Sequence, residues 1–233
     1  MFDALFTTTT EYKKLSHALS GKGACALFGL PASGRAQVYA ALCRQLDKPL
    51  CIVTPGEAEA TRFAADLNTL GIPAAVFPAR DYVLRSIEGT AREYEYRRLA
   101  VLGELVGGRL RAVAVPAEAL TQFTTPKEDF CANTRTLHAG DTLLRDDLLA
   151  ALFGAGYTRR AQVDGPGQFS VRGDIVDIFA PDQKMPVRME FWGDEIDTLH
   201  TFDLTTQRRE DAIDKFYLSP AREVLFGKPA DAA

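Results

Sequence analysis

The feature of this sequence that most constrains the fold is a change in hydrophobic pattern near Thr125. Before it, short apolar runs alternate with longer stretches of helical periodicity. The apolar runs lie at 24–30, 49–55, 74–78 and 111–116, and helices are expected at about 34–46, 57–70 and 90–105. This alternation predicts βαβ units. Because the runs are apolar along their whole length, we expect a parallel sheet that is covered on both faces.

After Thr125 the pattern is that of a small α+β domain. One amphipathic helix, at about 141–153, precedes consecutive strand candidates separated by turn residues. The candidate strands are 168–171, 174–179, 187–192 and 195–202. Glycine and proline at the junctions predict an antiparallel sheet. The last apolar segment, 215–219, leaves open whether the chain returns to the first sheet, which would make the second domain an insertion.

Composition narrows the class of protein. The 233 residues carry a net charge of −4, and no apolar run approaches the roughly 20 residues that a membrane span needs. The N-terminal segment lacks the basic and apolar regions of a secretion signal, so we expect a cytoplasmic protein. The acidic balance argues against a broad basic face for nucleic acid and favours a protein partner.

Neither the cysteines nor the histidines of the chain form a catalytic or metal-binding pattern. They are scattered along the sequence as Cys25, Cys43, Cys51 and Cys131, and as His17, His138 and His200. No C-x-x-C pair occurs, and no histidine lies at metal-ligand spacing from a cysteine. We therefore expect buried free thiols and no metal site.

The segment Gly29-Leu30-Pro31-Ala32-Ser33-Gly34-Arg35-Ala36, called the glycine segment below, has the spacing of the G-x-x-x-x-G-K-[ST] loop that cradles phosphates. It lies between a predicted strand and a predicted helix, as such loops do. Its chemistry differs, because Arg35 replaces the lysine that reaches the phosphates and Ala36 replaces the hydroxyl that holds magnesium.

Gly29, Ser33, Gly34 and Arg35 are thus predicted to form a degenerate phosphate loop. We expect no catalytic residue, no ATP hydrolysis and no cofactor. Two alternatives stay open for this segment: a strand-to-helix turn without a ligand, and residual binding of a nucleotide or anion.

The stretch PVRMEFWGDEID carries the clearest candidate for a binding surface. Its period of two places Val187 and its alternate neighbours in the core and leaves Arg188, Glu190 and Trp192 in one row on the other face. Arginine and tryptophan are enriched at interface hot spots. The alternative is that Trp192 packs under a loop and that Arg188 and Glu190 form a surface ion pair.

The run FSVRGDIVDIFAP followed by PVRMEFWGDEIDTLHTFDLTTQRR resembles the UvrB-homology region at the N-terminus of the bacterial transcription-repair coupling factors. The glycine segment and the stretches IVTPGEAEATRFAADL and VAVPAEAL resemble degenerate helicase motifs of the same region. The resemblance covers nearly the whole chain. It implies an α/β fold in two parts: a parallel-sheet, helicase-like domain with a degenerate phosphate loop over 1–125, which 214–233 would complete in one alternative, and a small α+β domain with an antiparallel sheet over 126–213.

The resemblance also implies a partner and a site. The second domain would dock onto UvrA through Arg172, Arg188 and Trp192, with Glu190 in the same row. Tryptophan stands where the family often has phenylalanine, and Ser170 stands where UvrB tends to have an arginine. The chain would recruit UvrA to stalled RNA polymerase in nucleotide excision repair. The ATP-dependent DNA translocase and the contacts with RNA polymerase and DNA would belong to regions of the full-length protein outside this chain.

Two other functions compete with docking. In the first, the chain is a nucleotide-dependent DNA-remodelling domain in which Arg35 does the work of the missing lysine. In the second, Arg92, Arg97 and Arg98 on the charged helix bind DNA without sequence preference, although Glu93 and Glu95 lie between them.

Overall fold

The computed structural model describes residues 7–21, 24–46, 48–80 and 90–224. The chain forms two compact units. The α/β unit consists of 1–79 and 107–122, and the β-rich unit consists of 80–106 and 123–233. The range 1–125, predicted as the first domain, therefore contains one segment, 80–106, that belongs to the β-rich unit.

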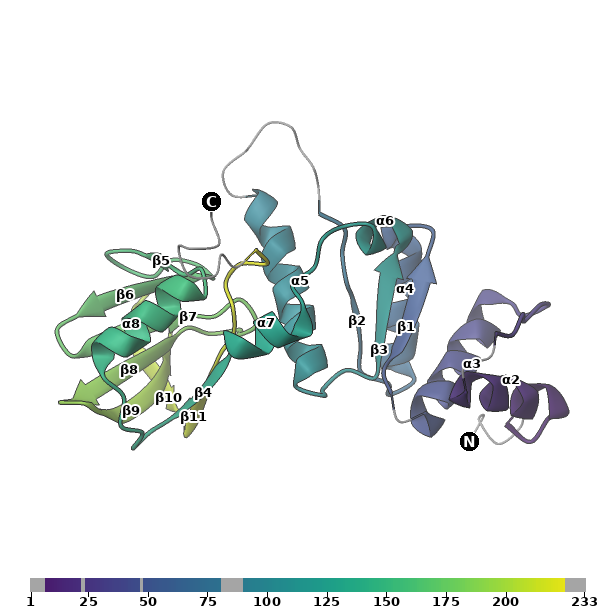
Figure 1. The fold of residues 1–233 in the computed structure, drawn as a ribbon, viewed down its shortest axis with the longest axis horizontal. Helices are drawn as coiled ribbons and strands as arrows, with labels where there is room; N and C mark the ends of the chain where they lie inside the picture. The colour runs from purple at the N-terminus through teal and green to yellow at the C-terminus, as the bar shows by residue number, and fades with distance from the viewer. Residues whose placement is uncertain (1–6, 22–23, 47, 81–89, 225–233) are drawn as a thin grey trace. The chain divides into compact units, whose positions relative to one another are not determined.

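The α/β unit contains a three-stranded parallel sheet in the order β1-β3-β2. Its strands are β1 (Leu50–Thr54), β2 (Ala74–Val76) and β3 (Ala112–Pro116). The central strand β3 pairs in parallel with both neighbours. The predicted parallel sheet and three of its four predicted strands are thus confirmed (Figure 1).

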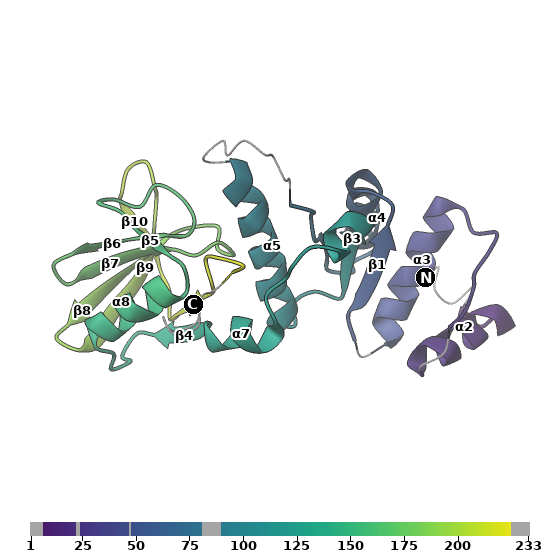
Figure 2. The same cartoon turned by 45° about the horizontal axis from the view of Figure 1, so that its top comes forward.

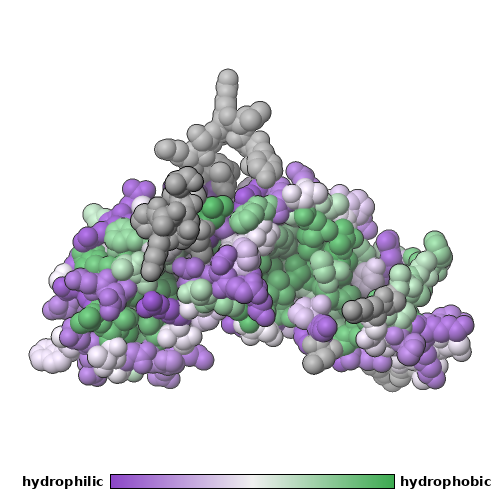
Figure 3. Space-filling model, in the orientation of Figure 1, coloured by the Kyte–Doolittle hydropathy of each residue, from purple (hydrophilic) through white to green (hydrophobic). Residues whose placement is uncertain are grey.

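Helices pack on one face of this sheet. They are α3 (Ala32–Gln45) and α4 (Glu57–Thr69). The helix α2 (Thr10–Ser20) packs against α3, and the short α6 (Ala117–Leu120) follows β3 directly. Cys43 of α3 and Phe63 of α4 share a core with Ile52 of β1 and with β3. On the opposite side of β1, Val53 is 54% exposed, and hydrophobic residues show over the sheet in Figure 3. The expectation that the sheet is covered on both faces is therefore wrong at β1.

The first predicted strand, 24–30, does not form. Its residues make no strand pairing, and Phe28 is 88% exposed. An apolar run becomes a strand only where a neighbouring strand supplies partners for its backbone N–H and C=O groups. Within the described residues β1 pairs with β3 alone, so this run has no such neighbour.

The β-rich unit contains a six-stranded sheet in the order β10-β9-β8-β7-β6-β5. The strands are β5 (Thr158–Arg159), β6 (Gln168–Arg172), β7 (Ile175–Phe179), β8 (Val187–Trp192), β9 (Glu195–Phe202) and β10 (Arg209–Ala212). All neighbours are antiparallel except β5 and β6. Gly173 and Gly193 have positive φ in the turns that follow β6 and β8. The predicted antiparallel sheet is confirmed.

Two further elements cover one face of this sheet, as Figure 2 shows for α8 (Arg145–Gly154). A two-stranded sheet of β4 (Arg135–His138) and β11 (Lys215–Leu218) completes the same core. The alternative in which 215–219 returns to the first sheet is wrong, because β11 pairs with β4. The predicted helix 141–153 begins only at Arg145, since Thr142 forms a bridge with Glu195 of β9.

The charged helix α5 (Thr90–Val106) belongs to the β-rich unit, as does the short α7 (Lys127–Ala132). Arg98 of α5 is fully buried, and its Nε donates to Oε1 of buried Glu223 at 2.7 Å. Nε of Arg80 donates to the other carboxylate oxygen at 2.7 Å. Glu95 accepts a hydrogen bond from the backbone N–H of Glu223 at 2.9 Å. This buried network ties the segment after β11 to α5.

Candidate docking site on the outer face of the six-stranded sheet

The alternation predicted for β8 is confirmed. Val187, Met189 and Phe191 are buried in the core beneath α8. Arg188, Glu190 and Trp192 therefore lie on the opposite face, called the outer face below. Strand register adds neighbours to this row, because Asp177 of β7 lies opposite Arg188 and Ser170 of β6 lies opposite Asp177.

Trp192 is an exposed residue of the outer face. It is the last residue of β8, beside the turn at Gly193, and it is 83% exposed. The alternative in which it packs under a loop is therefore wrong. A large aromatic side chain held on a strand end, with its apolar surface in solvent, has the form of an interface anchor.

Arg188 has the opposite character, because its side chain is only 10% exposed. Its Nε and Nη2 donate to the two carboxylate oxygens of Asp177 at 2.7 and 3.0 Å. Its Nη1 donates to the backbone carbonyl of Gln207 at 3.1 Å, and its guanidinium lies 4.7 Å from the ring centroid of Phe202. The hydrogen bonds to Asp177 raise the pKa of Arg188 against the opposing effect of burial. Arg188 therefore lies on the outer face but is buried there by its contacts with Asp177, Gln207 and Phe202.

Glu190 does not pair with Arg188. Its carboxylate forms an ion pair with Arg209 of β10 and accepts a hydrogen bond from Oγ1 of Thr198 on β9 at 3.4 Å. The predicted alternative of an Arg188–Glu190 surface pair is therefore wrong. The two charges of the row each have a partner on another strand.

Arg172 ends β6, and its side chain is 48% exposed. Its Nη2 donates to Oδ2 of Asp177 at 2.7 Å. The structure thus brings Arg172 and Arg188, which are far apart in sequence, onto one buried carboxylate. Sequence reasoning missed Asp177, although a charged residue inside the apolar run IVDIF was a usable signal.

The sequence DLTTQR, which follows β9, forms the turn that leads to β10. The carboxylate of Asp203 accepts hydrogen bonds from the backbone N–H groups of Thr205 and Thr206 at 3.1 and 2.7 Å. These bonds lower the pKa of Asp203. Gln207 adopts a positive φ of 59° at the end of this turn and presents its carbonyl to Arg188.

In the glycine segment, the predicted residues do not converge on a common partner. Gly29 has a φ of 83°, and α3 begins at Ala32 after an N-cap at Pro31 that makes no side-chain hydrogen bond. Arg35 Nη1 lies 3.7 Å from Oε1 of Glu59 on α4, and its guanidinium lies 5.6 Å from the ring centroid of Phe63. Of its four predicted residues, Ser33 is exposed and Gly34 and Arg35 are half-buried. Arg35 is thus directed toward α4.

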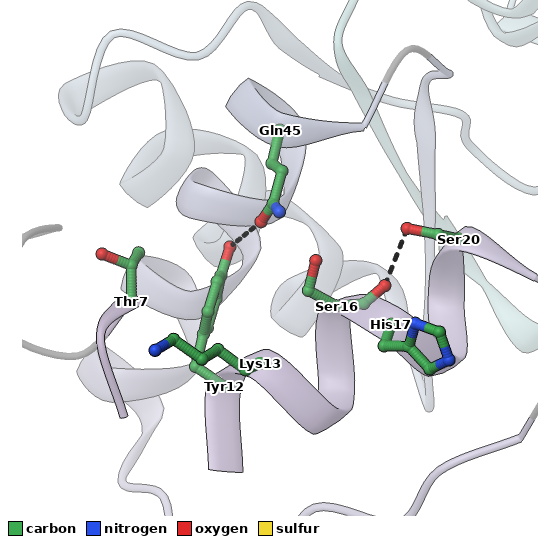
Figure 4. A pocket seen from close by; sticks show the side chains of 7 residues that line it. All are labelled: Thr7, Tyr12, Lys13, Ser16, His17, Ser20 and Gln45. Atoms are coloured by element: carbon green, nitrogen blue, oxygen red, sulfur yellow. Dashed lines mark hydrogen bonds between the residues drawn. The ribbon is translucent and has the colours of Figure 1, made fainter. Parts of the chain in front are cut away.

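A concave region lies between α2 and α3 of the α/β unit (Figure 4). Its lining is Thr7, Tyr12, Lys13, Ser16, His17, Ser20 and Gln45. The Tyr12 hydroxyl donates to Oε1 of Gln45 at 3.0 Å, and the Ser20 hydroxyl donates to the carbonyl of Ser16 at 2.8 Å. None of the predicted site residues lines this region, which forms the polar junction between the two helices.

Three further predictions concern the burial of the cysteines, metal sites and membrane-spanning helices. All four cysteines are free, but only Cys43 is buried, so the expectation of buried thiols is wrong for Cys25, Cys51 and Cys131. Within the ranges that the structure describes, no three His, Cys, Asp or Glu side chains are grouped as a metal site. No helix in the described part of the chain is long and apolar enough to cross a membrane.

The sequence of this chain is similar to one protein-domain family and to several known proteins. The sequence model of the UvrB interaction domain matches residues 136–224. A transcription-repair-coupling factor of Bacillus subtilis is 28% identical over 209 residues, which cover 89% of this chain and 18% of that protein. The corresponding protein of Myxococcus xanthus is 35% identical over 208 residues, 84% of this chain and 17% of the relative. The UvrABC system protein B of Chlorobium limicola is 28% identical over 217 residues, 87% of this chain and 32% of the relative.

Proposed function

We propose that this chain, which matches the UvrB-homology region of the transcription-repair-coupling factors over most of its length, is a docking module for UvrA in nucleotide excision repair. The module recruits UvrA to stalled RNA polymerase and acts by binding, without a reaction of its own. The outer face is the contact surface. Trp192 enters an apolar pocket of the partner, and Arg172 donates charge-assisted hydrogen bonds beside it.

The exposure of Trp192 is the observation that carries this proposal. Trp192 is 83% exposed, although the other side of the strand that bears it is buried. Leaving so large an apolar group in water forgoes the stabilisation that burial would give, and a partner that covers it recovers that stabilisation. Arg172 is half exposed on the same face, so an apolar anchor and a charged donor are presented together.

Arg188 and Glu190 have a supporting part in this proposal. Both belong to the same row, but their charges are paired with Asp177 and Arg209 within the sheet. Arginine held by a bidentate carboxylate contact is fixed in orientation. These residues therefore shape the surface around Trp192 and offer the partner only the atoms that remain exposed.

The competing functions receive less support. A nucleotide-dependent DNA-remodelling domain would need Arg35 at the phosphates, whereas Arg35 contacts Glu59 and Phe63 of α4. Non-specific DNA binding through α5 would need Arg98 at the surface, whereas Arg98 is buried against Glu223. We therefore place no catalytic residue and no cofactor in this chain.

We infer the wider setting from the names of the relatives, of which this chain matches 18% and 17% of the length. Binding of RNA polymerase and ATP-dependent movement on DNA would reside in the rest of a coupling factor, outside this chain. We place this module in the cytoplasm, where transcription and repair of bacterial DNA take place.

The test is calorimetric titration of the chain with UvrA from the same source. We expect a dissociation constant of about 1 μM or tighter, which corresponds to roughly −8 kcal/mol. Trp192→Ala and Arg172→Ala should each weaken binding by about 1–4 kcal/mol. Matched controls are Phe153→Ala, an exposed aromatic residue on α8, and Arg135→Ala, an exposed arginine on β4.

The controls should retain the wild-type affinity, because their side chains lie on the α8 side of the unit and on the two-stranded sheet. Absence of binding by the folded wild-type chain would reject UvrA docking. Binding that survives both outer-face substitutions would reject the site while leaving the partner in place.

A further inference from the structure

Asp177 is a buried charge in the middle of the outer face. It lies on β7 between Ser170 of β6 and Arg188 of β8 in the cross-strand register, and its side chain is 1% exposed. An ionised carboxylate in such a place is stable only when it is paired and hydrogen-bonded. The contacts of Asp177 therefore show what the residue does in the fold.

Arg188 by itself supplies the pairing that burial demands. It contacts both carboxylate oxygens of Asp177 from its Nε and Nη2 atoms, and it is almost as buried as its partner. One buried positive charge thus balances one buried negative charge. The additional bond from Arg172 to Oδ2 of Asp177 is not required for that balance.

This additional bond restrains a side chain at the surface, that of Arg172. Arg172 is half exposed, and a free arginine side chain there would lose rotamer entropy on binding a partner. The bond at 2.7 Å uses only Nη2. In the described part of the chain, the Nε and Nη1 atoms of Arg172 make no hydrogen bond, so they are available to an acceptor outside.

We propose that Asp177 is a positioning residue that holds the guanidinium of Arg172 in its docking orientation, and that Arg188 acts through Asp177 as its buried counter-charge. This inference rests on the proposed function and deepens it. It assigns the direct contacts to Arg172 and Trp192. The outer face then contains two exposed groups that meet the partner, Arg172 and Trp192. It also contains two buried groups, Asp177 and Arg188, that hold Arg172 in place.

A double-mutant cycle against UvrA tests the coupling. Asp177→Asn keeps the size of the side chain but removes the charge that attracts Arg172. We expect it to weaken binding about tenfold in the wild-type background, the range associated with immobilising one long side chain. In the Arg172→Ala background it should weaken binding no more than about twofold, because no guanidinium remains to be positioned. In the Trp192→Ala background the tenfold loss should persist.

A merely structural role for Asp177 predicts a different pattern. In that case Asp177→Asn would weaken binding equally in all three backgrounds, and this result would overturn the inference. Circular dichroism and thermal unfolding establish that each variant is folded. Should Asp177→Asn fail to fold, Arg172→Lys replaces it, because lysine keeps the charge but lacks the planar fork. An affinity loss as large as that of Arg172→Ala supports positioning, and wild-type affinity contradicts it.

A second measurement does not depend on UvrA. Relaxation of the ¹⁵Nε signal of Arg172 in the free chain reports the order of its guanidinium. We expect an ordered signal in the wild type and a mobile one in Asp177→Asn. Equal order in both would contradict the inference, whereas failure of the wild type to bind UvrA would reject the proposed function and leave this result standing.

Discussion

The glycine segment of the α/β unit and the outer face of the β-rich unit both present arginine side chains, but these arginines have different surroundings. Arg35 makes one partly exposed contact with Glu59 at 3.7 Å and lies near a phenylalanine ring. Arg172 and Arg188 converge on one buried carboxylate at 2.7 Å each. The first arrangement is a local surface contact, and the second is a network formed by three strands.

The two regions differ in how their residues are brought together. The glycine segment has the spacing of a phosphate loop along the chain, which is a local property. The outer face is assembled by strand pairing, which brings β6, β7 and β8 into register. We therefore expect substitutions in the outer face to have larger effects on stability and binding than substitutions in the glycine segment.

The largest effect is expected on the stability of the β-rich unit. Arg188→Ala leaves Asp177 buried with only Arg172 as a partner, and we expect it to lower the free energy of unfolding by about 3 kcal/mol. Urea unfolding followed by far-UV circular dichroism measures this. Arg135→Ala, at an exposed position on β4, serves as the control. A loss below about 1 kcal/mol would mean that the network does not stabilise the unit.

The next effect separates binding from stability. Trp192→Ala should cost about 2 kcal/mol or more of affinity for UvrA, as expected of an aromatic hot spot. Because the side chain is exposed, the free energy of unfolding should change by no more than about 0.5 kcal/mol. Calorimetry and urea unfolding of the same preparation provide both numbers. A variant that loses stability and affinity in parallel would show that Trp192 supports the fold rather than the contact.

A smaller effect is expected in the glycine segment. Arg35→Ala removes the half-exposed pair with Glu59, so the free energy of unfolding should fall by less than about 1 kcal/mol. Affinity for UvrA should stay at the wild-type value, and neither protein should hydrolyse ATP. ATP turnover by the wild type that disappears in the variant would favour the remodelling function and reverse the comparison.

The smallest effect is expected in the turn between β9 and β10, in which the carbonyl of Gln207 accepts a hydrogen bond from Arg188. The pKa of Asp203 is lowered from its ordinary value of 3.8 by hydrogen bonds from Thr206. A lowered folded-state pKa contributes stability that is present above the ordinary value and is lost as the pH falls through the lowered one. The melting temperature of the wild type should thus exceed that of Asp203→Asn at pH 6, and the difference should shrink below about pH 4. A difference that does not change with pH would contradict this account of the turn.

Much of the β-rich unit follows from the sequence, because its signals are local and strong. Glycines at 173 and 193 mark the turns, and period-two alternation places Met189 inside and Trp192 outside. The sequence did not reveal that Arg188 would be buried. Exposure on the outer face depends on the loops that cover it, here Gln207 and its turn, and periodicity identifies only the face.

The α/β unit was less predictable for a related reason. The run 24–30 has the apolar composition of a strand, but strand formation depends on a neighbour elsewhere in the chain. Its exposed Phe28 shows that composition alone does not supply that neighbour. The partners of Asp177 were hidden from sequence analysis in the same way, because both arginines meet it only through strand pairing.

We expect the outer face, and not the glycine segment, to contact the partner. Trp192 is the only tryptophan of the chain, so its indole Nε1–H gives a single NMR signal. We would titrate the ¹⁵N-labelled chain with unlabelled UvrA and, separately, with ATP and magnesium. Contact through the outer face predicts that UvrA shifts or broadens the indole signal and leaves the amides of the glycine segment unchanged, while the nucleotide affects neither. An unchanged indole signal in the presence of bound UvrA, or a nucleotide-dependent shift confined to the glycine segment, would contradict it.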